Sequence, residues 1–205
     1  KGVLPSTEWK KNTFKKPEQQ KWYEGETISL GIGQGYNSFT ILQLAHAMAN
    51  VANNGIVMKP HLVKAIEDPF TRKRSLTTPK ESYRIDLAPE NIEVIKKAMV
   101  EVNNSGTSAS VFKGTGYQVG GKTGTAQVFS LNSKEYNHGA TAEFLRDHAL
   151  YIAFAPVDKP TIVIAMVVEN AGFGAQYAAP IARKALDYYI EGKWPKEIPE
   201  WKRAP

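Results

Sequence analysis

The chain has 205 residues, of which 42% are hydrophobic, and its 26 Lys and Arg against 20 Asp and Glu give a formal net charge of +6. This apolar content suffices for one folded domain with a buried core. The longest apolar run, Ile162–Val168, is far too short to span a bilayer. The absence of cysteine excludes disulfides and thiolate metal sites. Because no arginine-rich stripe accompanies the positive charge, nucleic-acid binding is not expected.

The first part of the chain predicts an irregular segment followed by a helix. Residues 1–30 are rich in Lys and Pro and are expected to form an irregular wrap. A helix is predicted at about 38–53, with Ser38 or Thr40 as its N-cap and Gly55 beyond its end. Three aromatic side chains would anchor the wrap: Trp9, Trp22 and Tyr23. Five apolar residues at helical spacing would face the core: Ile41, Leu44, Ala45, Met48 and Val51.

The middle of the chain predicts short strands and then a second helix. Residues 56–85 are expected to form the strands, around Pro60 and Pro69. Pro89 opens the helix, which the segment 103–106, Asn-Asn-Ser-Gly, stops. The inward face of the helix is predicted from its apolar spacing: Ile92, Ile95, Met99 and Val102.

The last part predicts a sheet and a terminal helix. Strands are expected at about 117–129, 149–156 and 161–169, and the short connection between the last two favours an antiparallel hairpin. A helix over about 177–191 follows. The whole pattern predicts an α+β fold, with an antiparallel sheet flanked by helices.

The stretch Gly120–Val128 supports two incompatible interpretations. From Gly116 to Thr123 the sequence satisfies the P-loop pattern that cradles nucleotide phosphates. From Lys122, Lys-Thr-Gly is the third signature motif of penicillin-binding proteins and class A β-lactamases. A P-loop turns into a helix at its Lys-Thr, whereas residues 123–133 are poor in helix formers and lack a helical stripe. A strand is therefore predicted, and whether a strand or a helix follows Lys122 discriminates the two interpretations.

Other motifs accompany Lys-Thr-Gly in the order found in class B penicillin-binding proteins. Those before it are Leu4–Lys10, Trp22–Thr27, Gly31–Tyr36 with Thr40–Ala45, Asn54-Gly55 and Lys59–His61. Those after it are Leu145–His148, Phe154–Pro156 and Glu169–Gly172. The chain therefore resembles the elongation-specific members of that family, the penicillin-binding protein 2 type, although Ile41 stands where the family usually has Pro. The resemblance implies that residues 1–205 are the C-terminal portion of a transpeptidase domain, with helices and sheet in 31–191 and a loosely attached tail at 192–205.

The family acts through a Ser-x-x-Lys nucleophile, then Ser-x-Asn, then Lys-Thr-Gly, with long stretches between them. Ser110–Lys113 and Ser130–Asn132 match the first two patterns, but they lie close to Lys-Thr-Gly and not in the family's order. The nucleophile must begin a buried helix, and Gly114-Thr115-Gly116 should cut off any helix through Ser110. Both strings are interpreted as chance matches. The nucleophile is expected before Lys1, which would make this chain a C-terminal fragment.

Strand alternation divides the central motif between two faces. One face carries Thr123, Thr125 and Gln127, which the resemblance implies bind substrate, and the other carries Lys122, Gly124 and Ala126. By resemblance, the Thr123 and Thr125 hydroxyls hydrogen-bond the carboxylate of the substrate peptide or of a β-lactam, and Lys122 supplies positive charge. The Thr125 N–H would be one oxyanion donor. Gly124 would let an acyl-peptide backbone lie along the strand edge.

The remaining polar candidates are assigned supporting roles. His148, beside Asp147, is expected to make structural hydrogen bonds rather than act in the site. The other histidines are isolated or belong to the core, so no metal is expected: His46, His61 and His138. The Gly33-Gln34-Gly35 turn is expected to support the site without touching substrate, and residues 130–147 are expected to border the cleft.

The predicted function is a peptidoglycan D,D-transpeptidase that cross-links stem peptides ending in D-Ala-D-Ala through a serine acyl-enzyme, with no cofactor. The resemblance implies that β-lactams are covalent inhibitors and that cell-elongation proteins are partners. It also implies a periplasmic domain anchored in the inner membrane by a helix outside this chain. Two alternatives stay open: a P-loop nucleotide-binding protein, and a non-catalytic peptidoglycan-binding module without a nucleophile.

Overall fold

A three-stranded antiparallel sheet lies at the centre of the computed structural model, which describes residues 2–128 and 142–197. Its strands, in spatial order, are β5 (Gly120–Ala126), β6 (His148–Ala155) and β7 (Ile162–Val168). Lys122 pairs with Ile152 of β6. The sheet and its β6–β7 hairpin confirm the prediction, which rested on the β-branched and aromatic residues of these strands and on their short connection. The strand carrying Lys-Thr-Gly occupies one edge.

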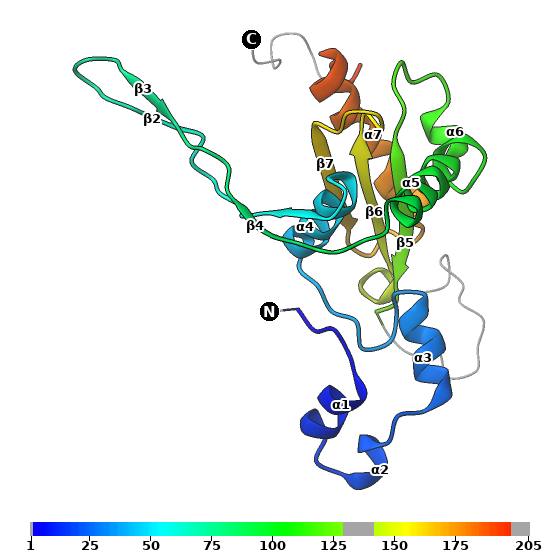
Figure 1. The fold of residues 1–205 in the computed structure, drawn as a ribbon. Coiled ribbons are helices and arrows are strands. Elements are labelled where there is room, and N and C mark those ends of the chain that lie inside the picture. The colour runs from blue at the N-terminus through cyan, green and yellow to red at the C-terminus, as the bar shows by residue number, and fades with distance from the viewer. Residues whose placement is uncertain (1, 129–141, 198–205) are drawn as a thin grey trace.

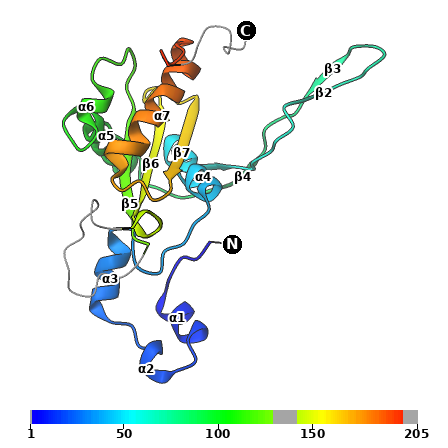
Figure 2. The same ribbon diagram turned by 180° about the vertical axis from the view of Figure 1, so that it is seen from behind.

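Helices cover both faces of this sheet (Figures 1 and 2). α7 (Gly174–Glu191) packs on one face, and α4 (Ile41–Ala52) packs on the other. β6 is buried from both sides, because Tyr151 belongs to the core under α7 and Phe154 to the core under α4. α5 (Pro89–Asn104) packs against β5. β5, the strand with the central motif, is therefore held by β6, which is buried on both faces, and by α5.

α4 begins as predicted, with Thr40 as its N-cap. The Gln43 N–H donates to Thr40 Oγ1 at 3.2 Å, and the Thr40 N–H donates to Gln43 Oε1 at 2.9 Å, which forms a capping box. The predicted apolar stripe faces the core, with Met48 buried and the other four residues half-buried. Beyond the helix, Asn54 and Gly55 have φ of 55° and 82° and reverse the chain.

α5 has the predicted ends, but the prediction of its inward face is wrong at Ile95, which is 47% exposed. Lys96 is buried instead. Its Nζ donates to Ala52 O at 3.1 Å and to Asn54 Oδ1 at 2.5 Å. Lys96 thus satisfies a carbonyl at the C-terminal end of α4, where helix carbonyls lack partners within the helix. Apolar spacing alone carries no signal for such a contact.

Residues 56–84 form an arm that extends away from the body (Figure 1). β1 (Ile56–Met58) pairs with β4 (Glu81–Arg84), and farther out β2 (Ala65–Glu67) pairs with β3 (Arg74–Leu76), both antiparallel. These are the short strands that the sequence predicts.

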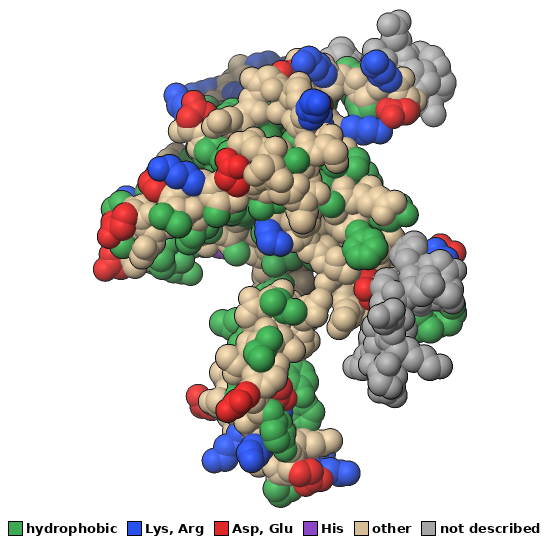
Figure 3. All heavy atoms as spheres, turned by 90° about the vertical axis from the view of Figure 1, so that its right-hand side faces the viewer, with side chains coloured by type: hydrophobic (Ala, Val, Ile, Leu, Met, Phe, Trp, Pro, Cys, Tyr) green, Lys and Arg blue, Asp and Glu red, His purple; other side chains and the backbone are tan. Residues whose placement is uncertain are grey.

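The N-terminal segment contains three short helices, so the prediction of an irregular wrap is wrong. They are α1 (Thr7–Thr13), α2 (Pro17–Gln20) and α3 (Glu24–Gly31). Ser6 accepts from the Trp9 N–H at 3.0 Å and starts the first of them. The buried Lys10 donates to Lys21 O at 2.7 Å and pairs with Glu26, and this contact ties α1 to α3. The three helices form a projection beyond the sheet (Figure 3).

The remaining elements adjust the predicted boundaries. α6 (Ala109–Phe112) is one helical turn, η1 (Glu143–Leu145) is a short 3-10 turn before β6, and α7 starts at Gly174 rather than near residue 177. Trp194 packs on Tyr188 with ring centroids 4.3 Å apart, so the beginning of the predicted tail contacts α7. Among the helices of the described segments, none is long and apolar enough to cross a membrane.

Candidate active site along strand β5

The Lys-Thr-Gly motif lies in the middle of a strand. Gly120–Ala126 pair residue by residue with β6, and no helix starts at Lys122. A P-loop needs a helix N-terminus at this point to bind phosphates. The geometry therefore excludes the P-loop alternative.

Two glycines before Lys122 let the strand lie tightly on its neighbours. A Cβ on Gly120 would come within 2.5 Å of the Phe154 ring. A Cβ on Gly121 would collide with the Tyr151 hydroxyl and come 3.0 Å from Asn103 Nδ2. Side chains at these positions would push the strand away from β6, so the glycines set the position of the motif.

A buried polar cluster lies beneath this part of the strand. Asn103 Nδ2 donates to Val119 O at 2.8 Å, and Asn103 Oδ1 accepts from Ser108 Oγ at 2.6 Å and from Tyr151 Oη at 2.7 Å. Burial raises the pKa of Tyr151 well above its usual range, so its hydroxyl stays a neutral donor. The cluster ties the end of α5 to β5 and β6. Nothing in the apolar pattern of the sequence indicates it.

The edge of β5 away from β6 presents backbone groups. Lys122 Nζ donates to Thr123 O at 2.8 Å, and Gln34 Nε2 donates to Thr125 O at 3.2 Å. These two carbonyls belong to alternate residues, so they lie on the same side of the strand. Within the described residues, no other strand pairs with this edge.

The motif residues surround a hollow of about 220 Å³ between the strand, the end of α3 and α4. Its lining comprises Ile32, Gly33, Leu44, Lys122, Thr123, Gly124, Thr125, Ala126, Leu150 and Ile152. Lys122 is exposed, and Thr123, Gly124 and Thr125 are half-buried. The structure thus brings together four of the five predicted site residues. Gln127 is exposed and follows the end of β5, outside this lining.

Two contacts at this site were not predicted. Gln34 belongs to the turn that was expected to support the site, and it reaches the strand directly at Thr125 O. Thr107, in the turn between α5 and α6, has its Oγ1 3.1 Å from Thr123 Oγ1. The sequence separations are 91 and 16 residues, so no local pattern reveals either contact.

The histidines make structural contacts. His148 Nδ1 accepts from the Asn170 N–H at 2.9 Å, which agrees with the predicted structural role. His46 Nε2 lies 2.9 Å from Met58 O, and His61 Nδ1 lies 3.0 Å from Val63 O. The described segments contain no cluster of His, Cys, Asp and Glu suited to a metal. His138 lies outside the described residues, as does most of the segment 130–147 that was expected to border the cleft.

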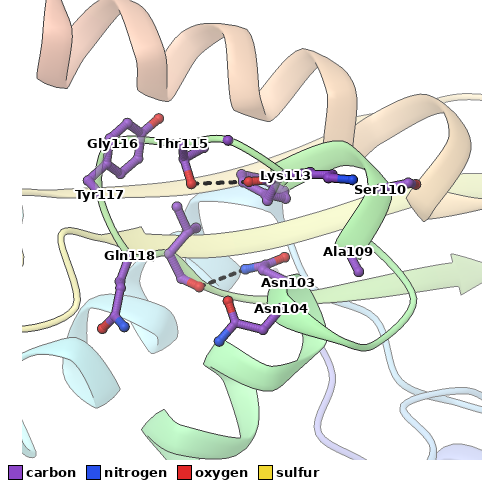
Figure 4. A pocket seen from close by; sticks show the side chains of 12 residues that line it. Asn103, Asn104, Ala109, Ser110, Lys113, Thr115, Gly116, Tyr117 and Gln118 are labelled. Carbon is purple, nitrogen blue, oxygen red and sulfur yellow. Dashed lines mark hydrogen bonds between the residues drawn. The ribbon is translucent and has the colours of Figure 1, made fainter.

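Ser110 and Lys113 lie beside a different cavity, of about 820 Å³, near the beginning of β5 (Figure 4). α6 includes Ser110 but ends at Phe112, as expected from the Gly114-Thr115-Gly116 segment that follows it. The helix is a single turn that ends before Gly114, whose φ is 78°. Ser110 is exposed rather than at the start of a buried helix. The second chance match, Ser130–Asn132, lies outside the described residues.

Residues 7–187 match the family model described as the penicillin-binding protein transpeptidase domain. The chain belongs to this family. It is 42% identical over 204 residues to the peptidoglycan D,D-transpeptidase MrdA of Haemophilus influenzae, covering 94% of this chain and 29% of that protein. The chain therefore spans about three tenths of the length of that curated relative. The family assignment confirms the resemblance drawn from the sequence motifs.

Solved structures of the family share the fold. PBP2 of Pseudomonas aeruginosa, in complex with WCK 5153, is similar with a TM-score of 0.72 and 36% identity over 97% of this chain and 41% of that one. PBP2 of Helicobacter pylori, solved in complex with MreC, has a TM-score of 0.69 and 25% identity, and the match covers 93% of this chain and 31% of that one. The imipenem acyl-enzyme complex of penicillin-binding protein A from Mycobacterium tuberculosis has a TM-score of 0.62 and 31% identity, and the match covers 79% of this chain and 33% of that one. The α+β fold is thus that of a penicillin-binding transpeptidase.

Proposed function

We propose that the protein containing this chain cross-links peptidoglycan stem peptides ending in D-Ala-D-Ala through a serine acyl-enzyme, during cell-wall elongation. The observation that carries the proposal is the Lys-Thr-Gly strand on a sheet edge, where no other described strand pairs with it. An extended peptide can add to such an edge as a further strand, with backbone hydrogen bonds fixing its register. Membership of a D,D-transpeptidase family supports the same reaction.

The edge would contribute an oxyanion donor and carboxylate-binding groups to acyl transfer. Gln34 donates to the Thr125 carbonyl from the side of the strand that faces away from β6. In an extended strand the N–H of a residue points to the same side as its carbonyl, so the Thr125 N–H also faces away from β6. This N–H is the proposed oxyanion donor, and one such donor contributes about 2.7–4 kcal/mol of transition-state stabilisation. The hydroxyls of Thr123 and Thr125 bind the substrate carboxylate, and Lys122 adds positive charge. Gly124 leaves room for the peptide backbone.

The nucleophile is proposed to lie outside these 205 residues. Ser110 is the only serine in the described segments with a lysine three residues later, and it is exposed on a single helical turn beside another cavity. Lys122 would support the serine of a Ser-x-Asn motif, which another part of the protein would also supply. Its amine is exposed and close to the strand edge, which suits that role.

The cellular setting is proposed by analogy with the relatives. β-Lactams would act as covalent inhibitors, since a similar protein is known as an imipenem acyl-enzyme. A MreC-like elongation protein would be a partner, as in the Helicobacter pylori complex. The chain would belong to a periplasmic domain of a protein anchored in the inner membrane.

The test is the intact mass of the complete protein after exposure to penicillin, followed by peptide mapping of the adduct. We expect one penicilloyl group on a serine that precedes Lys1. The variant Ser110→Ala should label to the same extent. An adduct on Ser110 would refute the assignment of the nucleophile. Absence of any adduct would refute the transpeptidase and favour a non-catalytic peptidoglycan-binding module.

A further inference from the structure

The turn between α5 and α6 has little freedom to move. The Gly106 N–H donates to Glu101 O at 2.8 Å, and a Cβ on Gly106 would lie 2.8 Å from Val102 Cα. Ser108 is fully buried, and its Oγ donates to Asn103 Oδ1 at 2.6 Å and lies 3.1 Å from Val102 O. Thr107 lies between these two fixed residues. Its position relative to the sheet is therefore set by the backbone on both sides.

Thr107 meets strand β5 at the middle residue of the Lys-Thr-Gly motif. Its Oγ1 lies 3.1 Å from Thr123 Oγ1, within hydrogen-bond distance. The end of α5, just before this turn, is tied to the residue that precedes β5, three residues before Lys122, through the contact of Asn103 with Val119 O. The two contacts enclose Lys122 along the chain. One of them involves a hydroxyl of the motif itself.

The chemistry of two paired hydroxyls limits what they can donate. Each threonine has one O–H and two acceptor lone pairs. When one hydroxyl donates to the other, a single O–H is left for a third group. A donor that receives a hydrogen bond at its own oxygen is also polarised, which strengthens the hydrogen bond that it donates.

We propose that Thr107 is a positioning residue, which donates to Thr123 Oγ1 and thereby directs the Thr123 O–H at the substrate carboxylate. The inference rests on the proposed function, since it takes the carboxylate of the peptide or of a β-lactam as the group that Thr123 binds. It assigns Thr107 to discrimination between carboxylate-bearing and neutral substrates. Without Thr107, the Thr123 hydroxyl is free to rotate away from the carboxylate.

The test compares acylation of the complete protein by benzylpenicillin and by its methyl ester, which lacks the charged carboxylate. Thr107→Val keeps the shape of the side chain and removes the hydroxyl. We expect the second-order acylation constant for benzylpenicillin to fall about five- to tenfold, as for the loss of one hydrogen bond, while the constant for the ester changes little. Thr107→Ser should restore most of the preference for the carboxylate. Ser105→Ala, in the same turn but bonded only to Glu101, is the matched control.

The outcomes separate this inference from the function on which it rests. If the constants for benzylpenicillin and for the ester fall together in Thr107→Val, Thr107 has only a structural role and the inference is wrong. Thr107→Ala provides the same comparison if the valine variant folds poorly. If the wild-type protein is acylated by neither compound, the proposed function fails and the inference fails with it.

Discussion

At the level of single residues, three side chains make hydrogen bonds to strand β5 near its free edge. Gln34 and Lys122 each donate to a carbonyl of the strand, at 3.2 and 2.8 Å. Thr107 contacts the hydroxyl of Thr123 from the turn after α5. Because neutral hydrogen bonds contribute only about 0.5–1.5 kcal/mol each, these contacts matter more for geometry than for stability.

Replacing Thr125 by Val should preserve folding and slow acylation. The branched shape stays the same in a half-buried site, while the hydroxyl proposed to bind the carboxylate is lost. Hydrogen bonds to charged groups contribute about 1.5–3 kcal/mol, so the acylation constant for penicillin should fall about ten- to hundredfold. Stopped-flow kinetics with a fluorescent penicillin measures it, with the exposed Thr78→Val in the arm as the control. An unchanged acylation constant would refute the proposed role of the Thr125 hydroxyl in binding the carboxylate.

Gln34→Ala should also slow acylation, by a smaller factor. The variant loses the donor to Thr125 O, and the end of the strand gains freedom at the residue whose N–H is the proposed oxyanion donor. We expect a loss of about fivefold in the acylation constant, as for one neutral hydrogen bond, with a melting temperature close to that of the wild type. Gln19→Ala, exposed on α2, is the matched control. Equal constants for the two variants would show that Gln34 has no part in positioning.

The element scale concerns how closely helices approach the strand. α7 begins at Gly174, which lies against β5 and β6. A Cβ there would collide with Leu150 O and come 2.5 Å from Gly124 O. Both obstacles are backbone atoms of strands, which cannot rotate aside. The start of α7 therefore presses directly on the glycine of the Lys-Thr-Gly motif.

Gly174→Ala should accordingly destabilise the domain and displace the motif. Overpacking of this kind typically costs about 1–3 kcal/mol, and here the shift would fall on Gly124 itself. We expect a lower urea midpoint and an acylation constant reduced beyond what the loss of folded protein explains. Gly31→Ala, at the end of α3 where nothing lies within 4 Å of the added Cβ, is the control. A fully stable and active Gly174→Ala variant would contradict the tight contact.

At the scale of the whole molecule, the buried Tyr151 and the half-buried Tyr117 link stability to pH. Burial raises the pKa of Tyr151 from its ordinary value of 10.0. Burial and the hydrogen bond to Asp187 likewise raise the pKa of Tyr117. Above about pH 10 the unfolded chain releases these protons while the folded chain keeps them. The free energy of unfolding is therefore unaffected by these groups below pH 10 and falls as the pH rises further.

Tyr151→Phe should reduce this alkaline loss of stability. Each such group contributes a slope of about 1.4 kcal/mol per pH unit where only the unfolded state is ionised, and the variant removes one of them. Because the hydrogen bond to Asn103 is lost, the free energy of unfolding of the variant should also be about 1 kcal/mol lower at pH 8. Urea unfolding of the transpeptidase domain between pH 8 and 11.5 measures both effects, with the exposed Tyr83→Phe as the control for a lost hydroxyl. A slope equal to that of the wild type would contradict the pKa shift.

The amino-acid sequence alone was enough to predict the family, the α+β class and the strand that carries Lys122. Each of these depends on local signals: Pro89 at the start of α5, Thr40 as the cap of α4, and a stretch after Lys122 too poor in helix formers for a P-loop. The strand positions of β6 and β7 follow from their β-branched and aromatic residues for the same reason.

The residues that surround the motif could be identified only from the folded chain. Lys96 is inward where spacing predicted Ile95, and α1 to α3 replace the expected irregular wrap around the buried Lys10. Gln34 and Thr107 reach the strand from distant turns. Periodicity reports which residues are apolar, but a hydrogen bond between residues far apart in sequence exists only once packing has brought their backbones together.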